Sequence, residues 1–181
     1  MKKIFVIIIV VMLLFFSITS FNAANSTAAL SGPSTVRAGD TITVTFKING
    51  TGILSAKGDV KSDSSKLTLT ETTQKIASPW TIDFNNTTGT VKFLAIDDKL
   101  TSPINSTKDL FTMTFKVKDL SAGTNVEIST ANLEYSDGGT DTYPSTAKYS
   151  FSIAPPKSTN NLLKSLTVNN ATISPAFNKN T

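Results

Sequence analysis

Residues 108–120, KDLFTMTFKVKDL, alternate apolar and polar side chains almost without interruption. The apolar side chains share one parity and are Phe111, Met113, Phe115 and Val117. The opposite parity carries only threonine and lysine between residues 112 and 118. A period of two is the signature of a β-strand with one face on a core and one face in water. The stretch therefore predicts a half-buried strand.

The same pattern recurs along most of the chain, in short segments separated by turn signals. They are residues 41–48, 53–60, 67–71, 80–84, 90–96, 110–117, 126–130 and 148–153. No segment between them keeps a 3.6-residue period. Many strands without crossover helices predict an all-β fold, an antiparallel β-sandwich or jelly roll. The sequence NGTG at residues 49–52 predicts a hairpin between the first two segments.

The two ends of the chain differ from this central part. Lys2 and Lys3 precede thirteen apolar residues and then a small-residue stretch, NAAN, which predicts a signal peptide over residues 1–24. The alternative is an uncleaved membrane anchor, but the apolar run is shorter than the ~20 residues of a spanning helix. We expect export to the cell surface or medium, with no stable membrane insertion after cleavage. Residues 154–161, rich in proline and small polar residues, predict a linker, and residues 162–181 the start of a truncated second domain.

Composition excludes several classes of function. The chain has no histidine and no cysteine, so Ser-His-Asp and Cys-His catalysis and disulfides are excluded. Without Lys2 and Lys3, the 17 basic residues become 15, against 13 acidic residues. This small surplus is spread along the chain without a basic, aromatic-rich cluster, so we expect no nucleic-acid binding. The sequence does not predict an enzyme.

Acidic residues offer two candidate sites that must be weighed against turns. Asp97, Asp98 and Asp109 suggest glycoside hydrolysis as one possibility, because that reaction uses paired carboxylates. Neighbours on a strand point to opposite faces, so a solvated turn is the favoured interpretation. Asp137 and Asp141 flank two glycines in a segment that could hold calcium, but Asp-Gly-Gly is typical of a turn and its spacing does not match an EF-hand loop, so a turn is the favoured interpretation.

Aromatic residues raise a third possibility, stacking on sugar rings. An exposed Trp80, flanked by Tyr135 or Tyr143, would form a carbohydrate-binding platform. Trp80 shares its parity with Ile82 and Phe84, so we favour a packed tryptophan over an exposed one.

The order and spacing of the strands resemble a bacterial cohesin domain over residues 28–153. The resemblance is carried by VRAGDTITVTFKING, ILSAKGDVKSDSSKLTL, VKFLAIDD and INSTKDLFTMTFKVK, which begin at residues 36, 53, 91 and 104. The domain would then span residues 25–153. The tail LLKSLTVNNATISPAFNKNT, residues 162–181, is similar to the opening of cadherin-like β-sandwich modules of bacterial surface proteins.

This resemblance implies a nine-strand jelly roll that binds a dockerin module in a scaffold for polysaccharide breakdown. No cofactor is implied for this chain, because the calcium of such a complex belongs to the dockerin. In the family, the third, fifth, sixth and eighth strands form the dockerin-facing sheet. The family often has Asn and Asp on the third strand, where this chain has Ser55 and Lys57. Alternatives are a carbohydrate-binding module and a passive spacer in a cell-surface protein.

Parity along the strands gives the candidate partner-binding residues. In residues 53–60 the inward set is Leu54, Ala56, Gly58 and Val60. The outward residues on the three strands are Ser55, Lys57, Asp59, Asp83, Asn85, Lys92, Leu94 and Ile96. We expect affinity to come from Leu94 and Ile96, unless a loop covers them. The eighth strand has no clear register, and no residue is assigned there.

Overall fold

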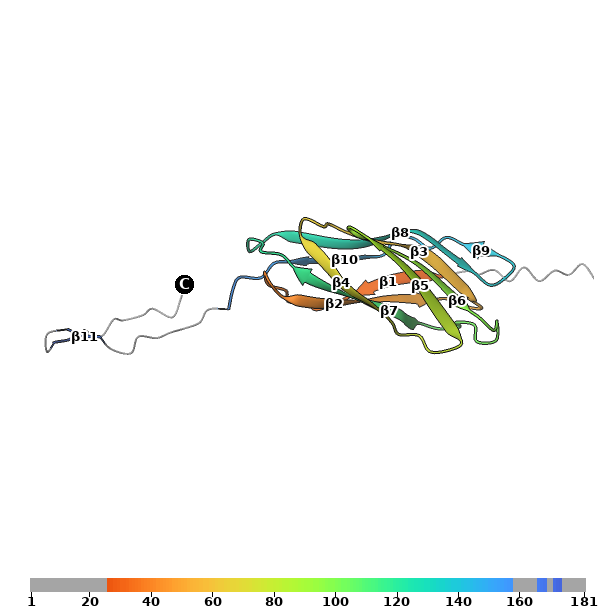
Figure 1. Cartoon of the computed structure of the whole chain (residues 1–181), viewed down its shortest axis with the longest axis horizontal. Helices are drawn as coiled ribbons and strands as arrows, with labels where there is room; N and C mark the ends of the chain where they lie inside the picture. The colour runs from red at the N-terminus through yellow and green to blue at the C-terminus, as the bar shows by residue number, and fades with distance from the viewer. Residues whose placement is uncertain (1–25, 158–165, 169–170, 174–181) are drawn as a thin grey trace, which may run out of the picture.

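The computed structural model describes residues 26–157, 166–168 and 171–173, and residues 26–157 form a β-sandwich (Figure 1). Its strands are β1 (Thr27–Ser31), β2 (Thr41–Asn49), β3 (Ser55–Ser62), β4 (Leu67–Gln74), β5 (Trp80–Thr87), β6 (Thr90–Asp97), β7 (Lys108–Val117), β8 (Asn125–Ser136), β9 (Asp141–Thr142) and β10 (Lys148–Ser152). The described residues contain strands and turns but no helix, so none of them could cross a membrane as a long apolar helix. The predicted all-β class is confirmed.

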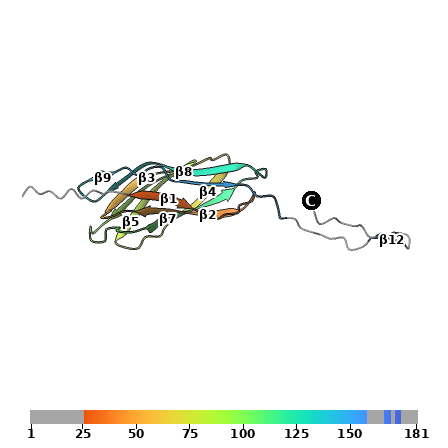
Figure 2. The ribbon, with the colours of Figure 1, turned by 180° about the vertical axis from the view of Figure 1, so that it is seen from behind.

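The strands form two sheets stacked face to face, which Figures 1 and 2 show from opposite sides. One sheet has the order β1-β2-β7-β4, and the other has the order β10-β8-β3-β6-β5 with β9 also paired to β8. Every strand pair in both sheets is antiparallel. There are ten strands where nine were expected, and the shortest, β9, has two residues.

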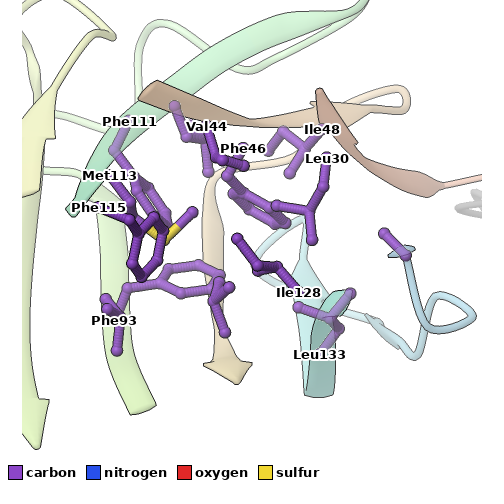
Figure 3. Packing of buried hydrophobic residues seen from close by; sticks show 14 of the residues in the cluster. Leu30, Val44, Phe46, Ile48, Phe93, Phe111, Met113, Phe115, Ile128 and Leu133 are labelled. Atoms are coloured by element: carbon purple, nitrogen blue, oxygen red, sulfur yellow. The ribbon is translucent and has the colours of Figure 1, made fainter. Parts of the chain in front are cut away.

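The core lies between the sheets and is centred on phenylalanine rings from both of them (Figure 3). Phe46 of β2 and Phe111 of β7 meet Phe93 of β6, with ring centroids 5.0–5.1 Å apart. The apolar residues of β7 point into this core, as their alternation with threonine and lysine predicts. Burying this apolar surface is the main favourable term in folding, and without disulfides it has no covalent support.

The predicted hairpin at residues 49–52 is wrong. β2 and β3 belong to different sheets, so this Asn-Gly segment carries the chain from one layer to the other. Gly52 has a φ of +74°, which explains the glycine, and Ile53 then pairs with Ile104 in an isolated bridge. Ile53 is consequently buried, and Leu54, which was expected to point inward, is only half-buried.

The beginning of the edge strand β5 is hydrogen-bonded by the side chain of Gln74, at the end of β4. Its Nε2 donates to the carbonyl oxygens of Ile76 and Trp80, both at 2.8 Å, and its Oε1 accepts from the Ile82 backbone N–H at 3.0 Å. The amide therefore satisfies part of an edge strand whose backbone groups would otherwise be free to pair with another chain.

We expect Gln74→Glu to lower the free energy of unfolding by about 1–3 kcal/mol. The carboxylate can still accept from Ile82, but it has no N–H for the two carbonyl oxygens. Urea unfolding measures the loss, with Thr68→Glu, an exposed position of the same strand, as the control. Equal stability of the two variants would contradict this role for Gln74.

The predicted end segments lie largely outside the described residues. Residues 1–24, the proposed signal peptide, are not described, and neither are residues 158–161 of the linker. The Ala154 backbone N–H donates to the Val36 carbonyl at 2.7 Å, so the linker begins attached to the sandwich. β11 (Leu166–Val168) pairs antiparallel with β12 (Ala171–Ile173), and the cadherin-like module stays a prediction.

Candidate functional site

The eight residues predicted to bind a partner lie on three adjacent strands of one sheet, β3, β6 and β5. Antiparallel register aligns them in rows across the strands. Leu94 is paired with Lys57 on one side and Asp83 on the other, and Ile96 is paired with Ser55. The next row joins Asp59, Lys92 and Asn85. These residues therefore form one contiguous surface, which we call the β3–β6–β5 face.

The side chains of this face point away from the core. Lys57, Asp83, Asn85 and Lys92 are exposed, and Ser55 and Asp59 are half-buried. Leu94 is 41% exposed and Ile96 is 37% exposed, so the described loops do not cover them. Their neighbours on β6, Val91, Phe93 and Ala95, are buried. The alternation of β6 thus fixes which of its residues are available to a partner.

Strand β8 adds two residues that the sequence analysis did not find. Glu134 Oε1 lies 2.7 Å from Lys57 Nζ, and this hydrogen bond raises the pKa of Lys57. Asn132 Nδ2 donates to Asp59 Oδ2 at 2.8 Å. Both contacts hold polar side chains of β3 in place before any partner arrives.

A β-bulge explains why the register of β8 could not be read from the sequence. Lys57 pairs with Glu134 and Asp59 pairs with Ala131, so Gly58 faces two residues of β8, Asn132 and Leu133. Asn132 adopts a φ of +53°, which asparagine tolerates better than most residues. The inward residues change parity there, from Val126, Ile128 and Thr130 to Leu133 and Tyr135.

Gly58 points inward as expected, at a position where side chains of the core and the bulged strand β8 crowd the space of a Cβ atom. A Cβ atom at residue 58 would lie 2.6 Å from Leu133 Cδ2 and 3.3 Å from the Ala131 carbonyl oxygen. The glycine allows β3 and β8 to approach closely at the bulge, next to the Lys57–Glu134 ion pair.

The carboxylates considered for hydrolysis are not brought together. Asp97 is fully buried, accepting from the backbone N–H groups of Lys99 at 3.2 Å and Ser102 at 2.5 Å. The expected solvated turn is therefore wrong for Asp97, whose carboxylate holds the β6–β7 loop. Asp98 points outward and accepts from the Thr81 hydroxyl, and Asp109 pairs with Lys47 in the other sheet at 3.2 Å.

The second acidic segment forms a turn closed by its own carboxylate. Asp137 Oδ1 accepts from the backbone N–H groups of Gly139 at 2.9 Å and Thr140 at 2.7 Å. These two hydrogen bonds lower the pKa of Asp137. Within the described part of the chain, no three His, Cys, Asp or Glu residues cluster as metal ligands would.

The three aromatic residues considered for sugar stacking differ in how much of each side chain is exposed to solvent. Trp80 is 4% exposed and its Nε1 donates to the Ser102 carbonyl at 2.9 Å, which confirms the packed tryptophan. Tyr135 is 1% exposed, and burial raises the pKa of its phenol. Only Tyr143, 72% exposed, presents its ring to solvent. The alternative of an exposed Trp80 flanked by a loop tyrosine is therefore wrong, because Trp80 itself is buried.

Known structures share the fold of this chain. A cohesin module from a family 33 glycoside hydrolase of Clostridium perfringens aligns with a TM-score of 0.62 at 16% identity, covering 71% of this chain and 96% of that one. The sixth cohesin of scaffoldin B from Acetivibrio cellulolyticus, solved with a dockerin, aligns with a TM-score of 0.59 at 18% identity over 72% and 99% of the two chains. A cohesin from a type I cohesin–dockerin complex of Clostridium thermocellum gives 0.57 at 16% identity over 67% and 96%.

Sequence comparison agrees with the fold. No curated protein gives a significant match to the chain. The family model described as "Cohesin domain" matches residues 26–154, which is more than two thirds of the 181 residues and includes all ten strands of the sandwich. The chain therefore belongs to the cohesin domain family.

Proposed function

We propose that this chain is a non-catalytic binding module that docks a dockerin-type protein on its β3–β6–β5 face. Two structurally similar cohesins, from Acetivibrio cellulolyticus and Clostridium thermocellum, were solved in complex with dockerins. The family's dockerin-facing strands, the third, fifth, sixth and eighth, are here the adjacent strands β8, β3, β6 and β5. Family membership and strand order thus support the same surface.

The observation that carries the proposal is the exposure of Leu94 and Ile96 on the central strand of this surface. On a sheet face that meets only water, large aliphatic side chains leave apolar surface unburied. Protein interfaces, in contrast, have an apolar centre within a polar rim. Leu94 lies between Lys57 and Asp83, which supply such a rim. Truncation effects concentrate on central anchors of this kind.

The polar residues would orient the partner. Lys57 and Asp59 are already held by Glu134 and Asn132, so little side-chain entropy is lost when a partner binds them. Ser55 and Lys57 stand where the family often has Asn and Asp. A partner must therefore accept a hydroxyl and an ammonium group on β3, and not an amide and a carboxylate. We expect this to select a subset of dockerins.

The setting proposed for this binding is extracellular. The predicted signal peptide supports export, and a bacterial cell-surface or secreted scaffold for polysaccharide breakdown fits the family. The chain itself would need no cofactor, since calcium would serve to fold the dockerin. Binding to polysaccharide has weaker support, because Trp80 and Tyr135 are buried.

We expect residues 25–157 to bind at least one module of a dockerin panel, with binding that is saturable in calcium and lost in EDTA. This fragment contains every strand and the whole core of the sandwich. Isothermal titration calorimetry measures the affinity, and the circular dichroism of the fragment in EDTA controls for its own folding. Absence of binding across a broad panel would reject the proposal and favour a spacer role.

A further inference from the structure

The face proposed for docking has an uneven charge distribution, which constrains the chemistry of the partner. Along β6, the face has two ends, one near Ile96 and the other near the turn to β5. The end near Ile96 carries more acidic groups than basic ones, and the other end does not. Residues 26–157 carry 13 lysines and arginines against 13 aspartates and glutamates, so the acidic end is not a consequence of the domain's composition.

The register places four carboxylates around the two exposed aliphatic residues. Asp83 is paired with Leu94, and Glu134 lies beyond Lys57 in the same row. Asp141 of β9 pairs with Ser136, which pairs with Ser55 in the row of Ile96. Asp98 accepts from Thr81, the other neighbour of Ile96. Carboxylates thus flank the apolar centre on both its β5 side and its β8–β9 side.

Few cations offset this charge. Lys57 is the ammonium group inside the acidic end, and it is paired with Glu134. Lys99, exposed in the turn after β6, adds a second. Two positive charges against four negative charges leave this end with a net charge of about −2. Toward the other end, the face carries Lys92 and Lys61 against the single carboxylate Asp59, which Asn132 already binds.

The other exposed aliphatic and aromatic side chains lie at the same acidic end. The exposed large hydrophobic residues of the described chain are Leu94, Ile96, Leu100 and Tyr143. Leu100 follows β6 with a φ of +54°, an uncommon conformation for leucine, and it is 65% exposed. Tyr143 directly follows Thr142 of β9, which pairs with Tyr135 of β8, and it is 72% exposed. Apolar contact and negative potential therefore coincide.

We infer that the docked module presents an apolar contact flanked by lysine or arginine on both sides. This rests on the proposed function and specifies which dockerins the face accepts. Complementary charge would raise the association rate. Because one end of the face along β6 is acidic and the other is not, one orientation of the partner would be favoured. A partner with an acidic rim would meet like charges at Asp83, Asp98 and Asp141, and would be rejected.

The test is the association rate of residues 25–157 with a dockerin that binds in the panel, measured by stopped-flow fluorescence between 20 and 500 mM NaCl. We expect the rate to fall by about tenfold over this range, because salt screens the attraction. Asp83→Lys should lower the rate by about five- to tenfold at 20 mM NaCl and by much less at 500 mM.

Glu71→Lys is the matched control, since it makes the same charge change on an exposed residue of β4, in the other sheet. Its rate should stay within about twofold of the unaltered protein. Binding with a rate that is insensitive to salt, or equal effects of the two substitutions, would overturn the charge inference and leave dockerin binding intact. Failure to bind any dockerin would overturn both.

Discussion

Leu94→Asp is expected to weaken partner binding by about 100-fold or more while leaving the sandwich folded. Leu94 is the apolar residue at the centre of the β3–β6–β5 face, between Lys57 and Asp83. A carboxylate there would have to lose its water on docking, beside the existing charge of Asp83. Because the Leu94 side chain is 41% exposed, its replacement removes little core packing. Isothermal titration calorimetry against a dockerin that binds the unaltered protein measures the loss of affinity.

The matched control is Thr43→Asp, which introduces the same carboxylate at an exposed position of β2 in the other sheet. Its affinity should match that of the unaltered protein. Urea unfolding of both variants separates loss of binding from loss of fold. Leu94→Ala, which adds no charge, should still weaken binding by about tenfold. If both Leu94 variants bound as tightly as Thr43→Asp, the proposed face would be wrong.

The outward residues of β5 and β6 could be predicted because these two strands pair without interruption. Eight consecutive residue pairs join them, from Trp80 with Asp97 to Thr87 with Thr90. In such a ladder, one buried residue fixes the side of every other residue. Phe93 is a large aromatic residue that belongs in the core and is buried there, so Leu94 had to point outward.

Strand β8 escaped prediction because the bulge at Asn132 breaks the rule that made β6 readable. The extra residue shifts the parity of the strand. Glu134 lies an even number of residues after the buried Thr130, so unbroken alternation would point it inward. In the structure it instead pairs with Lys57 on the outer face. The only local signal is an asparagine within an alternating strand, since asparagine tolerates a positive φ. Sequence spacing alone cannot distinguish this from a strand that simply ends.

Contacts between residues far apart in the sequence were the second feature that the sequence could not predict. Asn49–Gly52 has the residues of a hairpin turn, but turn chemistry does not determine which sheet the next strand joins. Ile53 is drawn into the core by its pairing with Ile104, more than fifty residues later. Local pattern carries no information about such a distant partner. Asp97 escaped prediction for another reason, since its partners are the backbone N–H groups of Lys99 and Ser102, in a nearby loop whose conformation the strand pattern does not specify.

Phe111→Ala is expected to lower the free energy of unfolding by about 3–5 kcal/mol, the largest stability effect we predict. Phe111 is fully buried, and its ring contacts those of Phe46, Phe84 and Phe93 at centroid distances of 5.0–5.1 Å. Truncation leaves a cavity between the sheets that these rings cannot readily fill. Differential scanning calorimetry should show a Tm lower by about 10–20 °C for a domain of this size.

Phe84→Ala provides the comparison, because it removes the same ring from a half-buried position where Phe111 is its aromatic neighbour. Its loss should be about half as large, and equal losses would show that Phe111 is not the centre of the core. At a temperature where Phe111→Ala is fully folded, we expect unchanged dockerin affinity. Phe93 would still hold β6 with Leu94 outward, so core packing would limit the amount of folded protein without altering the docking surface.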